Sequence, residues 1–274
     1  MNFVPVRLDA ITAPQRARGR LDLAFKHDGK GTRLARFYQE GCLKARLPRG
    51  PTMEAVAINI SGGIAGGDAL DIAVTLAPGA EVSFTTQAAE RIYRALDAPA
   101  RIHTRLTAGA ESSLHYLPQE TILFDGFGLD RVLEIEIATE AIFLGVESLV
   151  FGRLAMGEVV RGGFLRDRIS LRRQGQLLWQ DSTRLEGDIA TKLDHPGVAA
   201  GGRALASIFA VGPGISGQLD ALRTALAGAH AGASWTGEIL LARILAPDAA
   251  ALRRVVAKAL AVLRPGKLPR VWHG

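Results

Sequence analysis

Alternation of apolar and polar residues is the clearest pattern in this chain. Residues 69–76 place leucine, isoleucine and valine at every second position, with small or polar residues between them. A period of two predicts a β-strand with one buried face. Residues 133–137 repeat the pattern. Residues 165–179 predict a hairpin that turns at Gln174-Gly175.

Turn signals recur at equal spacing between these predicted strands. Residues 76–81 contain a Pro-Gly turn, a similar segment follows thirty positions later at 106–111, and a further break falls at 138–141. Equal spacing favours layered sheets whose strands stack in register, as in a β-helix. The competing interpretation is a chance similarity between glycine turns.

The C-terminal third changes character. Residues 217–228 and 248–263 carry leucine and valine at helical spacing, and Asp248 is a suitable N-cap before the second segment. Residues 235–246 could form a returning strand between the two helices. We therefore predict a mainly β fold of β-helix-like stacked sheets with two helices near the C-terminus. We expect one domain over 1–274, with residues 1–18 as a loose lead-in.

Composition narrows the class of protein. The 274 residues are 48% hydrophobic and carry a net charge of +6, with the arginines spread along the chain. Such a charge fits a solvated basic face, an acidic protein partner or nucleic acid, but no nucleic-acid motif is present. One cysteine, no signal peptide and no apolar run of membrane-spanning length predict a cytoplasmic protein without membrane association.

The glycine-rich segment GGIAGGD at 62–68 is the first candidate for chemistry. It lacks the Lys-Ser/Thr of a P-loop, and a strand follows it rather than a helix. A tight turn that needs positive φ is the simpler interpretation. The alternative is a point of close backbone approach beside a buried carboxylate, Asp68.

Catalytic and metal-binding signatures are missing from the sequence. The six histidines show no i,i+3 or i,i+4 pair, Cys42 stands alone, and no Gly-x-Ser-x-Gly motif occurs. We predict no catalytic residues and no tightly bound cofactor. Some carboxylates do lie in apolar or glycine-rich surroundings, where each needs an arginine partner, a ligand or a water-filled space: Asp68, Glu120, Asp125, Glu147, Glu158 and Asp181.

Several segments, in this order and spacing, resemble the urease accessory protein D family. The most telling are TTQAAERIYR at 85–94 and LPQETILFDG at 117–126. The others are GRLDLAF (19–25) with TRL (32–34), GGIAGGD (62–68), GRLAMGE (152–158) and GQLLWQD (175–181). The resemblance covers about residues 19–212. Ile58 to Ser61 stands where the family often has His-Pro-Pro.

The resemblance implies a non-catalytic nickel-insertion chaperone with a β-helix-like fold. Its expected partners are urease apoprotein and accessory protein F, which engages the GTPase accessory protein G, and nickel passes only transiently. Acidic residues line an internal passage in the family, and the motif matches make Asp68, Glu147 and Asp181 the candidates for weak nickel transit. Glu90 stands where small polar residues are usual. The alternatives are a purely structural adaptor, and a hydrolase built on Asp68 and Asp125.

Overall fold

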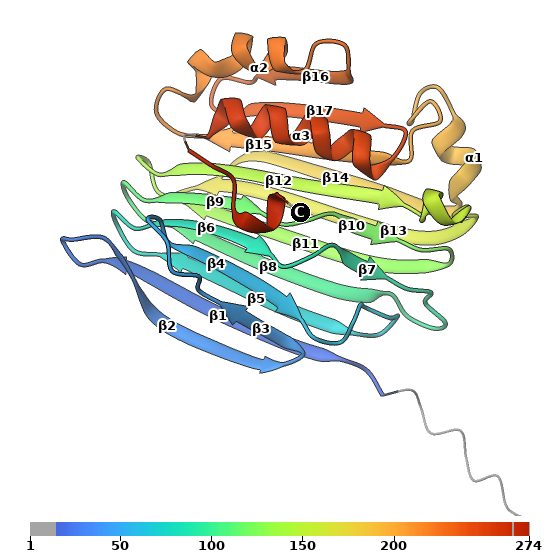
Figure 1. Ribbon diagram of the computed structural model, residues 1–274, viewed down its shortest axis with the longest axis horizontal. Coiled ribbons are helices and arrows are strands. Elements are labelled where there is room, and N and C mark those ends of the chain that lie inside the picture. The colour runs from blue at the N-terminus through green and yellow to red at the C-terminus, as the bar shows by residue number, and fades with distance from the viewer. Residues whose placement is uncertain (1–14, 265, 274) are drawn as a thin grey trace, which may run out of the picture.

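Two stacked β-sheets form the body of the molecule (Figure 1). The computed structural model describes residues 15–264 and 266–273. Most of the lead-in predicted for residues 1–18 lies outside the described residues, and the first strand begins at Arg18. The predicted fold class, mainly β with stacked parallel strands, is confirmed.

The first sheet has the strand order β14-β13-β11-β8-β5-β1-β2. Its strands are β1 (Arg18–His27), β2 (Thr32–Gly41), β5 (Ala69–Leu76), β8 (Ala100–Ala108), β11 (Phe127–Ile137), β13 (Gly162–Arg173) and β14 (Gln176–Asp188). The strand predicted over 69–76 is β5, and the predicted hairpin is β13–β14. Its turn residues Gln174 and Gly175 both have positive φ, as a tight hairpin turn requires.

The second sheet has the order β16-β17-β15-β12-β9-β6-β4-β3, and β10 joins β12 to β7 beside this path. Its strands are β3 (Leu43–Arg46), β4 (Glu54–Asn59), β6 (Glu81–Thr86), β7 (Glu90–Ile92), β9 (Ser113–Leu117), β10 (Thr121–Leu123), β12 (Ile142–Phe151), β15 (Ala204–Val211), β16 (His230–Trp235) and β17 (Leu240–Ala246).

Successive coils of the chain stack in parallel. Strands β5, β8, β11 and β13 pair in register in the first sheet, and β4, β6, β9 and β12 do so in the second. Alternation then places matching residues side by side. One apolar row crosses the first sheet from strand to strand, and its central members are Leu23, Val74, Leu106, Ile135 and Leu171. Burial of each such side chain contributes roughly 1.5–3 kcal/mol.

The recurring turns stack as well. The Gly79 amide donates to the Ala110 carbonyl and the Ser113 amide to the Ala80 carbonyl, which joins the first turn to the second. The Ala138 amide donates to the Ala108 carbonyl, which joins the second turn to the third. The spacing in the sequence is therefore a structural repeat and not a chance similarity.

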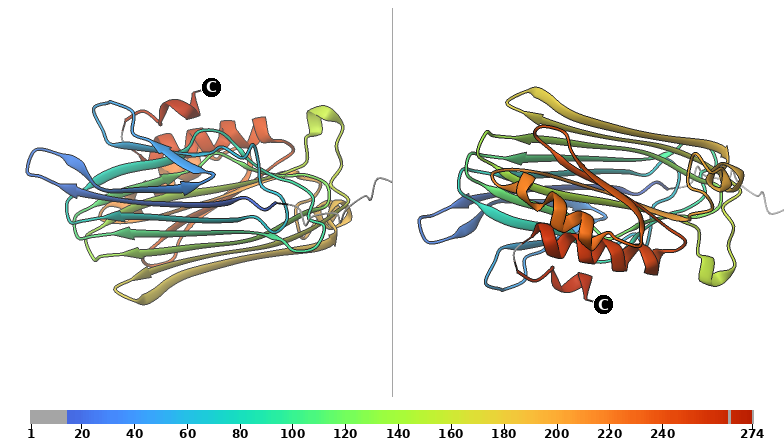
Figure 2. Two further views of the ribbon diagram at one scale, coloured as in Figure 1. Left: turned by 90° about the horizontal axis from the view of Figure 1, so that it is seen from below. Right: turned by 90° about the horizontal axis from the view of Figure 1, so that it is seen from above.

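Helices lie beside the C-terminal strands. They are α1 (Ile189–Asp194), α2 (Leu219–Ala225) and α3 (Ala249–Leu263), with short 3₁₀ helices at Leu154–Met156, Ile215–Gln218 and Arg270–Trp272. Figure 2 shows α2 and α3 side by side at the end of the stack. Asp248 caps α3 by accepting a hydrogen bond from the Ala251 amide. The two predicted helices match α2 and α3. Pro265, part of the predicted stop of α3, lies outside the described residues.

Candidate functional site

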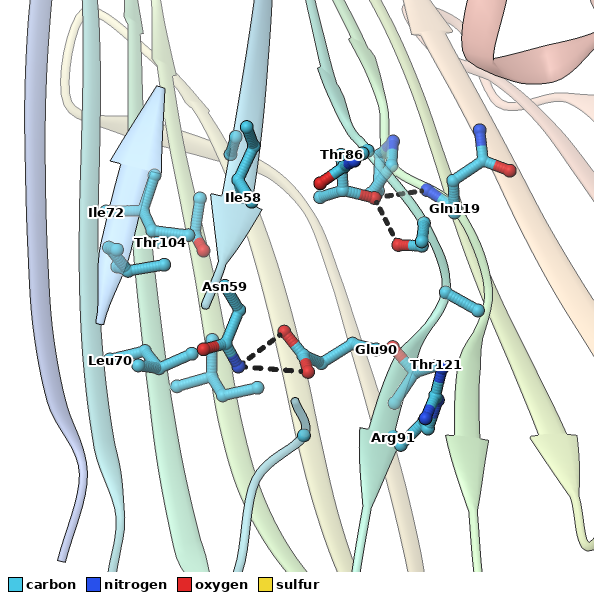
Figure 3. A pocket seen from close by; sticks show the side chains of 18 of the residues that line it. Ile58, Asn59, Leu70, Ile72, Thr86, Glu90, Arg91, Thr104, Gln119 and Thr121 are labelled. Atoms are coloured by element: carbon cyan, nitrogen blue, oxygen red, sulfur yellow. Dashed lines mark hydrogen bonds between the residues drawn. The ribbon is translucent and has the colours of Figure 1, made fainter. Parts of the chain in front are cut away.

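A cavity of about 160 Å³ lies between the inner faces of the two sheets (Figure 3). Its walls are largely apolar and come from both sheets, with Leu43 and Ala57 on one side and Leu70, Ile72 and Ile102 on the other. Its polar residues divide into two groups. We call the half-buried group around Glu90 the mouth, and the fully buried group around Arg131 the floor.

The mouth is built by residues one coil apart. Asn59 of β4 and Glu90 of β7 are 31 positions apart, and the Asn59 amide donates to Glu90 Oε1 at 3.1 Å and to Oε2 at 3.2 Å. Thr121 of β10 pairs with Glu90 in the parallel ladder. Stacking of the coils therefore places Asn59, Glu90 and Thr121 in one row.

Burial dominates the electrostatics of the mouth. It raises the pKa of Glu90 from 4.5 to about 7, and the Asn59 amide and the charge of Arg91 offset this only in part. Near neutral pH the Glu90 carboxyl group therefore exists in both protonation states. Its partners compensate little of the negative charge, so binding of a proton or a cation there disrupts few contacts of the fold.

The floor is a buried ion cluster centred on Arg131. Its guanidinium donates to both oxygens of Asp167, at 2.9 Å from Nε and 2.6 Å from Nη2. Nη1 lies 2.6 Å from Glu147 Oε2 and 3.2 Å from Thr121 Oγ1. The Tyr116 hydroxyl donates to Glu147 Oε1 at 2.9 Å. Thr121 thus connects the floor to the row of residues at the mouth.

Strand alternation explains why this cluster faces inward. On β11, Arg131 occupies the same face as the buried Leu129 and Leu133. Asp167 is its direct neighbour in the parallel pairing of β11 with β13. Glu147, on β12, reaches Arg131 from the opposite sheet. The cluster is therefore a polar cross-link between the sheets.

One guanidinium here faces two carboxylates. Their negative charges raise the pKa of Arg131, which stays protonated despite its burial. Burial raises the pKa of Glu147, and the positive charge of Arg131 opposes that shift. Burial and the neighbouring Glu147 also raise the pKa of the Tyr116 phenol. With all three ions charged, the floor carries a net charge of −1.

Asp68 holds the glycine turn. Gly62, Gly63 and Gly67 have positive φ. A Cβ atom on Gly63 would lie 2.3 Å from the Tyr93 ring, so only glycine fits there. The Asp68 carboxylate accepts hydrogen bonds from the Ala17 and Ala65 amides, both at 2.8 Å. Asp68 is buried, but it is not among the residues that line the cavity.

Asp181 lies at the other end of the first sheet. It faces inward on the edge strand β14, beside Ile169 in the ladder. Its Oδ2 lies 2.6 Å from Nη2 of Arg243 on β17, so this ion pair connects the two sheets where the first one ends. The three predicted nickel-transit residues thus occupy three separate places, and only Glu147 lines the cavity.

Arginine is the usual partner of the carboxylates that the sequence singled out. Glu120, Asp125, Glu147, Glu158 and Asp181 each pair with one. Asp125 also accepts hydrogen bonds from the Arg161 and Gly162 amides. Within residues 15–264 and 266–273, no group of three or more His, Cys, Asp or Glu side chains is placed to hold a metal ion.

The sequence patterns did not single out five residues of the site: Asn59, Tyr116, Thr121, Arg131 and Asp167. Two signals could have found some of them. The alternation of residues 133–137, extended backwards, puts Arg131 on the buried face, and the alternation of residues 165–171 does the same for Asp167. The interval of about thirty residues between turns also aligns Asn59 with Glu90.

Known proteins match this chain over nearly its whole length. A family model described as UreD urease accessory protein matches residues 17–273. A urease accessory protein UreD of Chelativorans sp. strain BNC1 is 45% identical over 271 residues, which cover 96% of this chain and 97% of the relative. The UreD of Rhizobium rhizogenes is 41% identical over 267 residues, with 96% and 98% covered. That of Xanthobacter autotrophicus is 44% identical over 262 residues, with 94% and 90% covered.

The family prediction made from the sequence is therefore confirmed. One further finding concerns membranes: none of the helices in the described part of the chain is long and apolar enough to cross one.

Proposed function

Because the chain belongs to the UreD urease accessory protein family, we propose that its role in urease maturation is nickel delivery. In this proposal the protein is a cytoplasmic scaffold that binds urease apoprotein and accessory protein F. Through F it receives nickel that the GTPase accessory protein G releases. It acts as an accessory protein and not as an enzyme.

The observation that supports nickel delivery best is the cavity with its two carboxylates. Glu90 at the mouth and Glu147 at the floor both line it, and hydroxyl groups of Thr104 and Thr121 lie between the apolar walls. Oxygen ligands bind a divalent transition metal more weakly than nitrogen or sulfur ligands do. Weak binding suits an ion that must leave again.

The charge balance of the floor also favours a cation. Arg131 alone would repel nickel, but Glu147 and Asp167 together exceed its charge. Glu147 contacts Arg131 through one oxygen and Tyr116 through the other. An arriving cation can therefore replace one of these contacts while Asp167 keeps Arg131 in place.

Asp68 and Asp181 remain proposed transit contacts on the strength of the family resemblance. Each also has a structural role that competes with this one. Asp68 ties the strand entry at Ala17 to the glycine turn, and Asp181 pairs with Arg243 across the sheets. An experiment that measures nickel loading and assembly separately can distinguish the two roles.

We therefore propose to co-express Asp68→Ala, Glu147→Gln and Asp181→Ala with urease and its accessory proteins. Asp130→Asn is the matched control, because Asp130 is a similarly sheltered carboxylate paired with Arg166 on the outer face of the first sheet. If a residue contacts nickel in transit, its substitution should lower urease activity and nickel content while the complex still co-purifies. Full nickel loading in all three variants would overturn the hypothesis that nickel passes along these carboxylates.

A second candidate function is a structural adaptor without a metal role. The Arg131 cluster favours it, since ion pairs that join two sheets stabilise a fold whether or not nickel passes. If the adaptor is correct, the variants should lose stability and assembly together, and nickel content per assembled complex should not change.

A further inference from the structure

In residues 15–264 and 266–273, no further strand covers the N-terminal end of the stack. Strand β2 pairs with β1 along one edge, and its other edge is the border of the first sheet among the described residues. In Figure 1 it forms the lower border of the molecule. A border strand of ten residues presents a row of unpaired backbone donors and acceptors, which is a template for strand addition.

The apolar core surface continues onto this open strand. Phe37 lies beside Leu23 in the ladder, and Leu34 lies beside Phe25. Leu23 and Phe25 are 0% and 1% exposed, whereas Phe37 and Leu34 are 40% and 37% exposed. The inward row of the sheet therefore extends one strand beyond the part that is covered. A further strand with apolar inward residues would bury both side chains.

The opposite face of β2 is basic. Arg33, Arg36, Tyr38 and Glu40 alternate with the inward residues and face outward. Arg33 pairs with Asp28 and Arg36 with Asp22 of the same chain. Charge is concentrated around them, because residues 26–53 contain seven lysines and arginines and two acidic residues. The net charge of residues 26–53 is +5, and that of the whole chain is +6. The loop side of this end contributes Lys30 and Arg49.

From these rows we propose that β2 is a docking edge for a strand of another protein. That strand carries apolar residues that pack beside Phe37 and Leu34, and acidic residues that face Arg33 and Arg36. The inference rests on the proposed function, in that the partner is a component of urease maturation.

Two other occupants fit the edge less well. A second copy of this chain would bring its own basic segment 26–53 to the seam, so the net positive charge there would double. A lipid surface would leave the backbone groups of the edge without hydrogen-bond partners. An acidic strand satisfies the backbone groups, the apolar row and the basic row together.

The other border of the same sheet provides matched controls. Strand β14 also has an exposed apolar residue, Leu177, at 44%. Arg184 on β14 pairs with Glu186 at 2.9 Å and its side chain is 67% exposed. Arg36 on β2 pairs with Asp22 at 3.0 Å and is 66% exposed. The two edges thus offer comparable substitutions at side chains of similar exposure.

The test is co-purification of the tagged full chain with urease apoprotein and, separately, with accessory protein F. Phe37→Ser and Arg36→Glu should each weaken capture of one partner about tenfold or more, as expected for residues at the centre of an interface. The controls Leu177→Ser and Arg184→Glu should stay within about twofold of wild type. Circular dichroism melting verifies folding. If Phe37→Ser proves unstable, Arg36→Glu decides, because its side chain lies in solvent.

Each outcome has a distinct meaning. If the wild type captures a partner and the folded β2 variants capture it equally well, the docking edge is wrong and the proposed function stands. If the wild type captures neither partner, both are wrong. A wild-type dimer that only the β2 variants dissociate, with partner capture unchanged, would assign the edge to a second copy and overturn the proposal.

Discussion

Two carboxylates in one cavity, Glu90 and Glu147, have opposite relations to the fold. Glu147 contacts a guanidinium and a phenol from two other strands, and its charge holds the sheets together. Glu90 contacts the amide of Asn59 from the neighbouring coil. Burial raises the pKa of both carboxyl groups, but an ion pair between the sheets fixes Glu147, whereas an amide of the neighbouring coil holds Glu90.

The difference follows from where the partners come from. The partners of Glu147 approach across the space between two sheets, so the site is enclosed and every polar atom needs a match. The partner of Glu90 lies along the same stack, which leaves one side of its carboxyl group open to the cavity. The floor therefore joins the two sheets, while the mouth presents a carboxyl group to the cavity.

Removal of Arg131 should have the largest effect on the free energy of unfolding. Arg131→Met leaves Glu147 and Asp167 buried without a counter-ion, and loss of one partner of a buried ion pair costs about 3–5 kcal/mol. Urea unfolding monitored by circular dichroism measures it. The control is Arg105→Met on the outer face of the first sheet, which should change stability by less than about 0.5 kcal/mol. A loss below about 1 kcal/mol for Arg131→Met would show that the cluster does not cross-link the sheets.

Glu90→Gln should stabilise the protein at high pH. The pKa of Glu90 is about 7 in the folded chain and 4.5 ordinarily. Below pH 4.5 both states hold the proton, so the group has no effect there. Between 4.5 and 7 the unfolded chain releases the proton while the folded chain keeps it, so stability falls as pH rises. Above pH 7 the loss is complete, and it amounts to at most about 3 kcal/mol.

Unfolding free energies of wild type and Glu90→Gln at pH 5 to 8 test this. We expect the variant to be more stable at pH 8 by about 1–3 kcal/mol, with the gap closing towards low pH. Glu140→Gln is the control, because Glu140 is exposed in the turn between β11 and β12 and contacts no charged partner among the described residues. Equal slopes against pH for Glu90→Gln and wild type would contradict the uncompensated carboxyl group at the mouth.

The smallest expected effect compares two tyrosines. Tyr116→Phe removes the hydroxyl that donates to Glu147 in the floor, at a cost of about 1–2 kcal/mol because a charged buried acceptor loses a partner. Tyr93→Phe removes a hydroxyl that donates to the Gly62 carbonyl at 3.2 Å in an exposed contact. Water can replace that bond, so its change should be less than about 0.5 kcal/mol. Equal losses in thermal melts of both variants would show that the Tyr116 hydroxyl contributes no more to stability than an exposed hydrogen bond does.

Much of the fold could be predicted because its signals are local. Alternation identified β5 and the β13–β14 hairpin, equal turn spacing indicated the stack, and a helical period with Asp248 at its start located α3. Helix α1 was not predicted, because its six residues span less than two turns and show no periodicity. The strand expected over 235–246 is shorter, Leu240–Ala246, since residues 230–235 form the separate antiparallel strand β16.

The site was harder to predict than the fold. Buried carboxylates were recognised from their apolar surroundings, and Glu147 was among them. The central residue, Arg131, was not, because an arginine in a charged stretch resembles a solvent-exposed residue until the strand period is followed through it. Asp167 was passed over for the same reason, since arginines flank it on both sides.

The sequence by itself determined the local periods, the turns and the family. These depend on residues close together along the chain, whose preferences act within a single strand, helix or loop. The tertiary structure alone decided which inward residues meet across the cavity. Arg131 reaches Asp167 through the pairing of two coils and reaches Glu147 through the packing of two sheets. Both contacts depend on the offset between coils and the separation of the sheets, and packing of the whole core sets these quantities.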